Sequence, residues 1–187
     1  MNLILLFDED FIDDHRVRLT GRRLRHVLEV HRAAVGNVLR VGRLGGMLGK
    51  GRVLRLDDEA LEMAVGFEEP PPAPLPVTLL LALPRPKVLK RTLLAVTSLG
   101  VKRIVLMNSF RVEKSFWKSP TLSGEKLREP LLLGLEQACD TMLPEILPRP
   151  LFKPFVEDEL PGLCAGSTCL AAHPAATAQA PREPAGP

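Results

Sequence analysis

The sequence is poor in aromatic residues: its 187 residues include no Tyr, one Trp and seven Phe. RNA-binding sheets of the RRM type stack bases on Phe and Tyr side chains of their strands. A chain with 4% aromatic residues is a poor candidate for such a sheet. If this protein binds RNA, we expect it to use phosphate contacts, shape and a pocket.

Cysteines and long apolar runs are also scarce. Three cysteines, an odd number, fit reduced thiols in the cytosol better than a disulfide framework. Cys164, Cys169 and His173 have a spacing that resembles three metal ligands, but a closed zinc site takes four, so we predict no metal site. No apolar run is long enough for a membrane span, and the apolar start lacks the basic residues of a signal peptide. We therefore expect a cytoplasmic protein without a membrane partner.

The net charge is only +3, but it is unevenly distributed along the chain. Residues 15–55 carry eleven Lys or Arg and one acid, and residues 85–128 carry eleven Lys or Arg and two acids. These two basic blocks have net charges of +10 and +9, whereas the rest of the chain has −16. Two such surfaces favour a polyanion such as RNA as partner. Two solvated faces of an ordinary globular protein would give the same pattern, so both interpretations stay open.

The first 69 residues have the pattern of a small β-barrel with one helix. Residues 2–7 are a candidate edge strand, and apolar residues at helical spacing after Thr20 predict a short helix over 21–31. Short strands with a single helix suggest a barrel. Gly and Asp residues separate the three strands expected next, which are Val38–Val41, Gly51–Leu56 and Ala60–Phe67.

A proline-rich stretch over residues 70–76 divides the chain. Prolines this dense cannot join a helix or a central strand, so we interpret the stretch as a stiff linker and as the domain boundary. Residues 1–69 and 77–187 are then two domains. A second Ala- and Pro-rich stretch, residues 175–187, has no periodicity and is predicted to be disordered.

The second domain begins with an α/β pattern. Val77–Leu83 is a continuous apolar run, as expected for a strand buried on both faces. An apolar stripe over 88–96 predicts a helix, and Lys102–Met107 is a second buried strand, which completes a strand–helix–strand unit. A helix over 123–141 then leads to two further strands, predicted at Ile146–Phe152 and Thr168–Ala172.

A group of cations stands at the start of the first α/β helix. Lys87, Lys90 and Arg91 share one helix face because of their spacing, and Arg85 precedes them. Positive charge at a helix N-terminus opposes the macrodipole, so this charge suits a phosphate ligand. Solvated side chains opposite an apolar stripe would show the same spacing.

Polar residues near the ends of predicted α/β elements are further candidates. Arg111, with Lys114 behind it, follows a buried strand, and ligands of open α/β sheets bind beyond the carboxyl ends of the strands. A loop arginine paired with Glu113 is the alternative for Arg111. Gln137 can donate and accept hydrogen bonds, which suits a base edge or an exposed polar helix face. His173 and Pro174 follow another predicted strand. No phosphate-binding glycine loop, nucleophile elbow or metal-binding helix motif is present.

Four stretches, in order, resemble one family. They are LRHVLEVHRAAVGNVLRV, LALPRPKVLKRTLLAVTSLGVKRIVLMNSFRVEKSFW, LEQACDTMLPEI and CLAAHP. Together they resemble the ribosomal small-subunit RNA methyltransferase E family, over the whole chain. The resemblance implies the α/β fold class: an N-terminal PUA-like β-barrel over 1–69 that grips RNA, the linker, and a SPOUT methyltransferase domain, whose α/β fold ends in a trefoil knot.

The resemblance also implies an activity. Members of the family use S-adenosylmethionine to methylate N3 of a uridine in small-subunit ribosomal RNA, and a homodimer is expected. We predict that Arg111 stabilises an anion or binds a phosphate, that Gln137 reads the base, and that the cofactor lies against Leu170, His173 and Pro174. RNA contacts are predicted for nine cations: Arg22, Arg23, Arg25, Arg43, Arg85, Lys87, Lys90, Arg91 and Lys114.

The sequence departs from the family pattern in several places. Glu29 stands where the family often has Arg, Ser98 where it often has an acid, and Cys139-Asp140 where a basic residue is common. The largest departure is the lack of the glycine-rich loop and following segment that form the knot and most of the cofactor pocket. We therefore expect an incomplete SPOUT domain over 77–187. A truncated, non-catalytic RNA-binding or ribosome-assembly protein that uses the same basic surface is the alternative, and a small-molecule α/β enzyme is a third.

Overall fold

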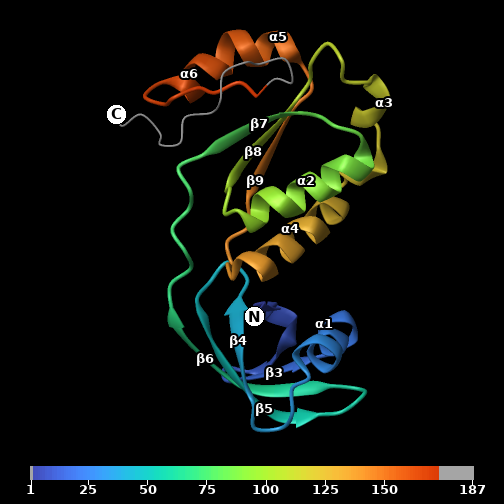
Figure 1. Cartoon of the computed structure of the whole chain (residues 1–187), viewed down its shortest axis with the longest axis vertical. Coiled ribbons are helices and arrows are strands. Elements are labelled where there is room, and N and C mark those ends of the chain that lie inside the picture. The colour runs from blue at the N-terminus through green and yellow to red at the C-terminus, as the bar shows by residue number, and fades with distance from the viewer. Residues whose placement is uncertain (1, 173–187) are drawn as a thin grey trace.

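A computed structural model describes residues 2–172 and shows a mixed α/β fold with two sheets (Figure 1). A curled six-stranded sheet lies at one end of an elongated molecule, and a three-stranded sheet lies toward the other end. The chain passes between the sheets through residues 70–77, which contain no helix or strand. The proline-rich stretch therefore connects the two sheets.

The curled sheet has the strand order β1-β4-β5-β6-β3-β2. Its first strand pairs in parallel with β4, and the other neighbours are antiparallel. The three strands predicted within residues 38–67 are confirmed, whereas two short strands before the first helix were missed because they hold too few residues to show a period. The six strands are β1 (Ile4–Leu6), β2 (Phe11–Asp13), β3 (Arg16–Leu19), β4 (Val38–Arg43), β5 (Leu48–Leu56) and β6 (Leu61–Glu69).

One helical segment covers the inner face of this sheet. Helix α1 (Gly21–His26) continues into a π-type turn over Val27–His31, and the left-handed residue Arg32 ends it. Leu24 and Val27 are buried in the core of the curled sheet. The prediction of one regular helix over 21–31 is therefore wrong in its second half, where β-branched residues lower the α-helical propensity.

The three-stranded sheet is parallel and has the order β7-β8-β9. Helices α2 (Pro86–Ser98) and α4 (Gly124–Ala138) pack on each other and on the strands, through a core that includes Leu89, Leu93 and Ile104. The strand–helix–strand prediction is confirmed. The strands are β7 (Thr78–Ala82), β8 (Arg103–Met107) and β9 (Glu145–Arg149).

Strand β7 is less buried than the sequence predicts. Its apolar run indicates burial on both faces, but its residues are half-buried or exposed. The reason is its place at the edge of the sheet, where only β8 pairs with it. The central strand β8 is the one with a buried middle.

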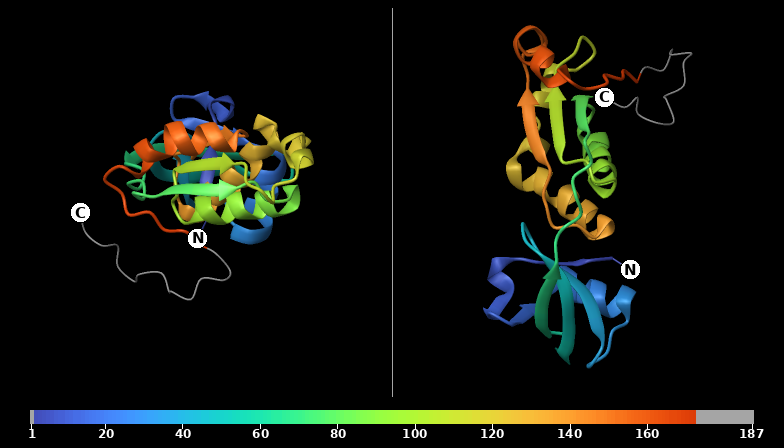
Figure 2. Two further views of the ribbon diagram at one scale, coloured as in Figure 1. Left: turned by 90° about the horizontal axis from the view of Figure 1, so that it is seen from above. Right: turned by 90° about the vertical axis from the view of Figure 1, so that its left-hand side faces the viewer.

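Short helices lie near the carboxyl ends of the parallel strands. They are α3 (Lys114–Trp117), α5 (Phe152–Pro154) and α6 (Leu160–Cys164), the last two joined by a π-type turn over Phe155–Glu159. Figure 2 shows the strands between α2 on one side and α5 and α6 on the other. Further 3-10 turns span Asp8–Asp10 and Pro120–Leu122.

The predicted strand over 168–172 is wrong. These residues are exposed and have no regular structure, and none of the described strands pairs with them. Apolar content alone cannot form a strand, because its backbone groups need a neighbouring chain. The tail over 175–187, predicted to be disordered, lies outside the described residues.

Between residues 2 and 172, none of the helices has the length and apolar character needed to cross a membrane.

Candidate nucleic-acid interface

The C-terminal end of α4 docks onto the curled sheet. The Leu3 amide donates to the Glu136 carbonyl at 2.9 Å, and the Gly45 amide donates to the Thr141 carbonyl at 2.9 Å. The Thr141 hydroxyl donates to the Gly46 carbonyl at 2.5 Å. These bonds hold the two sheets at a fixed distance. Buried leucines from both sides fill the contact: Leu3, Leu5, Leu48 and Leu135.

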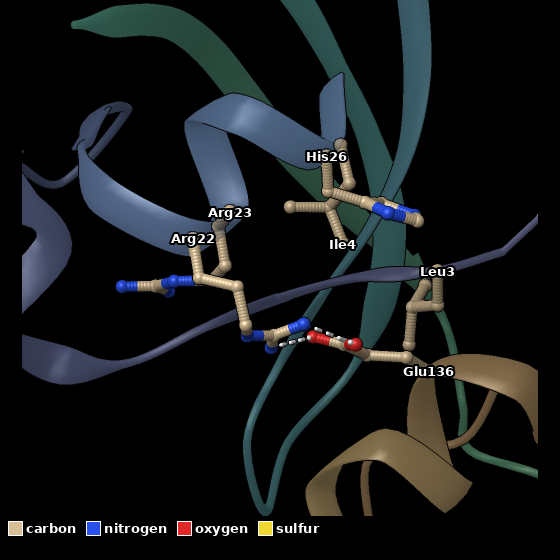
Figure 3. A pocket seen from close by; sticks show the side chains of 6 residues that line it. All are labelled: Leu3, Ile4, Arg22, Arg23, His26 and Glu136. Atoms are coloured by element: carbon tan, nitrogen blue, oxygen red, sulfur yellow. Dashed lines mark hydrogen bonds and ion pairs between the residues drawn. The ribbon is translucent and has the colours of Figure 1, made fainter. Parts of the chain in front are cut away.

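An ion pair reinforces this contact. Arg22 of α1 donates to both carboxylate oxygens of Glu136, from Nη2 at 2.8 Å and from Nη1 at 3.2 Å (Figure 3). The Glu136 side chain is only 11% exposed, whereas Arg22 is 53% exposed. The hydrogen bonds to Glu136 raise the pKa of Arg22 above its usual value. The two terminal nitrogens of Arg22 thus bind Glu136 of α4, and the remainder of the side chain is largely exposed to solvent.

Arg23 is bound more completely than its neighbour. Its guanidinium pairs with Asp10, with Nη2 at 2.6 Å from Oδ1, and also donates to the Leu5 carbonyl at 2.9 Å. Asp10 is buried, and the Arg23 side chain is 17% exposed. The guanidinium lies 4.4 Å from the centre of the Phe7 ring. Little of this group is left for a phosphate, so its contacts are structural.

A cleft of about 360 Å³ lies between the start of the chain and α4. Arg128 of α4 lies 5.9 Å from the Phe7 ring, so cations of both basic blocks meet here. Two acids also line the cleft, and one of them, Glu129, pairs with Lys90 at 3.4 Å. The cleft therefore has mixed charge. Its lining residues are Phe7, Arg22, Arg23, Glu125, Arg128, Glu129, Leu132 and Leu133.

The other predicted cations of the curled sheet differ in their contacts. Arg43 pairs with Asp8 at 2.9 Å and lies 5.1 Å from the Phe11 ring. Arg25 is exposed and makes no ion pair within the described part of the chain. Only Arg25 of this pair presents a free guanidinium to solvent.

The N-terminus of α2 presents exposed cations, which fits both a phosphate ligand and solvated side chains. Arg85 precedes the helix, and its carbonyl accepts the amides of Val88 and Leu89, both at 2.9 Å. Arg85, Lys87 and Arg91 are exposed and form no ion pair with any described residue. Arg85 and Lys87 follow the carboxyl end of β7, and Arg91 lies in the second turn of α2.

Arg111 lies where the sequence predicts it, after the carboxyl end of β8. It is exposed, as is Lys114 at the start of α3. The loop is held at its base, because the Asn108 amide donates to the Arg149 carbonyl at 3.0 Å and Trp117 Nε1 donates to Asn108 Oδ1 at 3.3 Å. The carboxyl end of the sheet thus gathers cations from two adjacent strands.

Gln137 lies at the opposite end of the same sheet. Its Oε1 accepts from the Ser98 hydroxyl at 3.0 Å, where α2 and α4 both end. Helix α4 has 15 residues and so spans about 22 Å, and it runs against the strand direction (Figure 1). The structure therefore does not bring Arg111 and Gln137 together within one chain.

The predicted cofactor residues are only partly described. Leu170 is 68% exposed in an irregular segment, and His173 and Pro174 lie outside the described residues. An exposed Leu170 covers no ligand, so the described residues do not enclose a cofactor at this place. Over residues 2–172 there is no cluster of three or more His, Cys, Asp or Glu that could hold a metal ion.

Sequence reasoning missed the structural role of Glu136 and the positions of Phe7 and Arg128. Glu136 precedes the candidate Gln137 in a Leu-rich helix, but it follows the buried Leu135 and is itself 8% exposed. Gly134, Leu135 and Glu136 are buried in succession, which covers about 200° of the helix circumference and so requires a second element beside α2. Nothing in the sequence indicates that this element is the first sheet.

Comparisons with known proteins find a family match and several relatives. The family model of the RNA methyltransferase domain matches residues 71–183. The ribosomal RNA small subunit methyltransferase E of Treponema pallidum is 30% identical over 148 residues, which cover 78% of this chain and 56% of that protein. This chain thus spans little more than half the length of that curated relative.

Solved structures share the fold at lower identity. The crystal structure of a ribosomal RNA small subunit methyltransferase E from Neisseria gonorrhoeae bound to S-adenosyl methionine has a TM-score of 0.62 at 18% identity, and covers 85% of this chain and 65% of that one. A probable rRNA-methyltransferase from Porphyromonas gingivalis has a TM-score of 0.62 at 17% identity, with 84% and 64% covered.

Proposed function

The chain belongs to the RNA methyltransferase domain family and is similar to ribosomal RNA small subunit methyltransferase E, and from this we propose that it methylates N3 of a uridine in small-subunit ribosomal RNA. The observation that carries the proposal is the family match over residues 71–183, which includes the whole three-stranded sheet and its helices. The 30% identity to the Treponema pallidum enzyme supports rRNA as the substrate.

We propose S-adenosylmethionine as the methyl donor, since a structural neighbour from Neisseria gonorrhoeae was crystallised with it. The described residues near Leu170 do not fit an enclosed site for this molecule, because that side chain is exposed. The residues that we do assign belong to the RNA side of the reaction.

Arg111 is the residue that we propose to act on the target nucleotide. N3 of uridine carries a proton and is hidden in a base pair, so the substrate has to be unpaired or flipped. Loss of the proton places negative charge on the carbonyl oxygens of the base, and a cation there stabilises it. Arg111 is exposed beyond the carboxyl end of β8 and has no ion-pair partner in the described chain, so its guanidinium is available.

Gln137 lies at the other end of the sheet from Arg111, so we propose a different contribution for it. It lies at the amino ends of the strands, so it can contact the same uridine as Arg111 only from another copy of the chain. The homodimer that we propose would allow this. The exposed cations at the start of α2 would then hold the phosphates around the target, and they are Arg85, Lys87 and Arg91.

The domain assignment is part of this proposal. Residues 1–69 would be a PUA-like barrel that grips RNA, residues 70–76 the linker, and residues 77–187 a part of a SPOUT methyltransferase domain. An rRNA substrate also implies a location in the cytoplasm.

Two measurements test the proposal. Calorimetric titration with S-adenosylmethionine should give a binding isotherm, and the protein with labelled donor and small-subunit rRNA should transfer label to uridine. Arg111→Ala should lower the transfer rate by about 100-fold, the loss typical of removing one charge-stabilising group. Arg103→Ala, which removes a 47% exposed cation at the amino end of β8, at the opposite end of the sheet, is the matched control.

Full transfer by the Arg111→Ala variant would remove this residue from the reaction. No heat with the donor, together with salt-dependent RNA binding, would instead support the non-catalytic RNA-binding alternative. Absence of RNA binding would count against both.

A further inference from the structure

The outer face of the curled sheet carries a group of cations to which none of the residue assignments above gives a role. Along β5 the side chains alternate, with Gly51 and Val53 buried and Lys50 and Arg52 exposed. Strands β3 and β4 show the same alternation, with apolar residues inside and cations outside. The curled sheet thus has an apolar inner face under α1 and a basic outer face. Its cations are Arg16, Arg18, Arg40, Lys50, Arg52 and Arg55.

The strand register places like charges next to each other on this outer face. Arg40 of β4 stands directly opposite Lys50 of β5. Arg52 stands opposite Ala64 of β6, and Ala64 stands opposite Arg16 of β3. Like charges directly opposite across strands destabilise a sheet. A bound polyanion would remove this repulsion, so the arrangement favours a ligand with repeated negative charge.

Acidic residues pair with four of the six cations of this face, and one of these acids, Glu62 of the central strand β6, lies 4.0 Å from Arg18 and 3.9 Å from Arg55. Arg16 pairs with Asp13 at 2.7 Å, and Arg55 pairs with Asp57 at 2.6 Å. Toward the other margin Arg40 pairs with Glu69 at 3.4 Å. In contrast, Lys50 and Arg52 form no ion pair with any described residue. Two cations without an ion pair in the described structure therefore lie next to each other on one face of β5, among cations that are paired.

The neighbours of these two cations are small. Across the β5–β6 ladder, Lys50 stands opposite Gly66 and Arg52 opposite Ala64. A Cβ added at Gly66 would meet no atom within 4 Å, so the surface beside Lys50 is open. Residues two apart on a strand lie about 6.7 Å from each other on the same face, a spacing close to that of successive phosphates in an extended nucleic-acid strand. A phosphate chain can therefore approach both cations along β5.

We infer that the outer face of the curled sheet, centred on Lys50 and Arg52, binds the phosphate backbone of an RNA strand. The inference rests on the proposed function and adds a surface to it that lies outside the cleft and outside the carboxyl end of the parallel sheet. The face presents no aromatic side chain between these cations, so it holds RNA by charge and does not read bases. Contacts of this kind fix the position of the RNA and leave the choice of nucleotide to another site.

The double variant Lys50→Gln/Arg52→Gln tests the inference in the full chain. Its binding to a fluorescently labelled single-stranded RNA is measured by anisotropy over a series of KCl concentrations. Each lost phosphate contact on a single strand lowers the magnitude of the salt slope by about 0.7, so the variant should lose about 1.4. At 0.1 M salt this corresponds to roughly 25-fold weaker binding.

Two further variants separate this surface from general charge and from misfolding. Arg103→Gln/Lys153→Gln removes the same charge from exposed, paired positions on β8 and α5, outside the curled sheet, and should leave the slope unchanged. Lys50→Arg/Arg52→Lys exchanges the two cations and should also keep it. Thermal melting checks the fold, and the melting temperature of Lys50→Gln/Arg52→Gln should equal or exceed that of the wild type because a repulsion is removed.

The outcomes distinguish the inference from the function on which it rests. An unchanged slope in Lys50→Gln/Arg52→Gln, or an equal loss in Arg103→Gln/Lys153→Gln, overturns the inference while RNA binding by the wild type leaves the proposed function standing. If the wild-type chain binds no RNA, both are overturned. A loss confined to the Lys50 and Arg52 variant supports the surface.

Discussion

Two regions of the first basic block use the same kind of side chain in opposite ways. At the contact between the sheets, Arg22 and Arg23 pair with the buried carboxylates of Glu136 and Asp10. On the outer face of the curled sheet, Lys50 and Arg52 stand beside Ala and Gly and have no ion-pair partner among the described residues. The number of charges along the sequence does not distinguish these four cations. The comparison shows that only the second pair is available to a polyanion.

The physical origin of the difference is the environment of each cation. A carboxylate that is buried must be paired, because an isolated charge inside a protein is costly. Arg22 and Arg23 meet that requirement and so stabilise the fold. The outer-face cations instead repel each other across the strands and cost stability. Substitutions at the two regions should therefore have effects of opposite sign on folding.

The largest effect is expected for Arg23→Ala. It leaves the buried carboxylate of Asp10 without its partner, and breaking a buried pair typically costs about 3–5 kcal/mol of the free energy of unfolding. Arg25→Ala, two residues along the same helix, removes an exposed charge and should change that free energy by less than about 0.5 kcal/mol. Denaturant titration measures both, and similar values for the two variants would break the comparison.

A smaller effect on the free energy of unfolding is expected from a Gly→Ala substitution in each of the two regions. At Gly42 a Cβ would lie 2.5 Å from Cγ2 of Thr141 and 2.9 Å from Cδ2 of Leu48, inside the contact between the sheets. Gly42→Ala should therefore cost about 1–3 kcal/mol by overpacking. Gly66→Ala meets no atom on the outer face and should be neutral or stabilising by up to about 1 kcal/mol. Equal melting temperatures for the two variants would show that the contact can relax.

The smallest effect that we expect concerns the protonation of His31 and its contribution to the free energy of unfolding. Burial and the neighbouring His26 lower the pKa of His31 below its usual 6.5, and the buried Nε2 of His31 has no hydrogen-bond partner in the described structure. The unfolded chain therefore binds this proton more tightly than the folded chain does. The stability contributed by neutral His31 is complete above pH 6.5 and is lost as the pH falls through its lowered pKa.

His31→Gln should accordingly flatten the dependence of unfolding free energy on pH below about 6.5. Denaturant titrations of both proteins at several pH values measure the difference. Parallel curves for the wild type and the variant would exclude a contribution from this residue.

Much of the fold was predictable from local pattern. The alternation in residues 38–67 gave three strands, and the change of period after residue 76 gave the strand–helix–strand unit, because a sheet face and a helix stripe each leave a repeat in the sequence. The strands β2 and β3 were too short for a repeat. The run over 168–172 has the composition of a strand but no neighbour to pair with in the described structure.

The candidate site was predictable only in part. Arg111 lies at the carboxyl end of β8 as the topology requires, since the residue after a parallel strand must emerge at that edge. Gln137 could not be placed in the same way. Its distance from Arg111 depends on the direction in which α4 crosses the sheet, and the sequence of α4 contains its period but not its partner.

The sequence by itself determined the two kinds of periodicity, the position of the proline-rich connection and the number of cations in each block. It did so because these properties depend on residues a few positions apart. Only the tertiary structure decided which cations pair with a carboxylate of the protein. Glu136, which is 114 residues away in the sequence, binds Arg22. The register of β5 and β6 places Lys50 and Arg52 opposite the small residues Gly66 and Ala64. Contacts between segments far apart in the sequence decide whether a cation pairs with a carboxylate of the protein or remains available to a ligand.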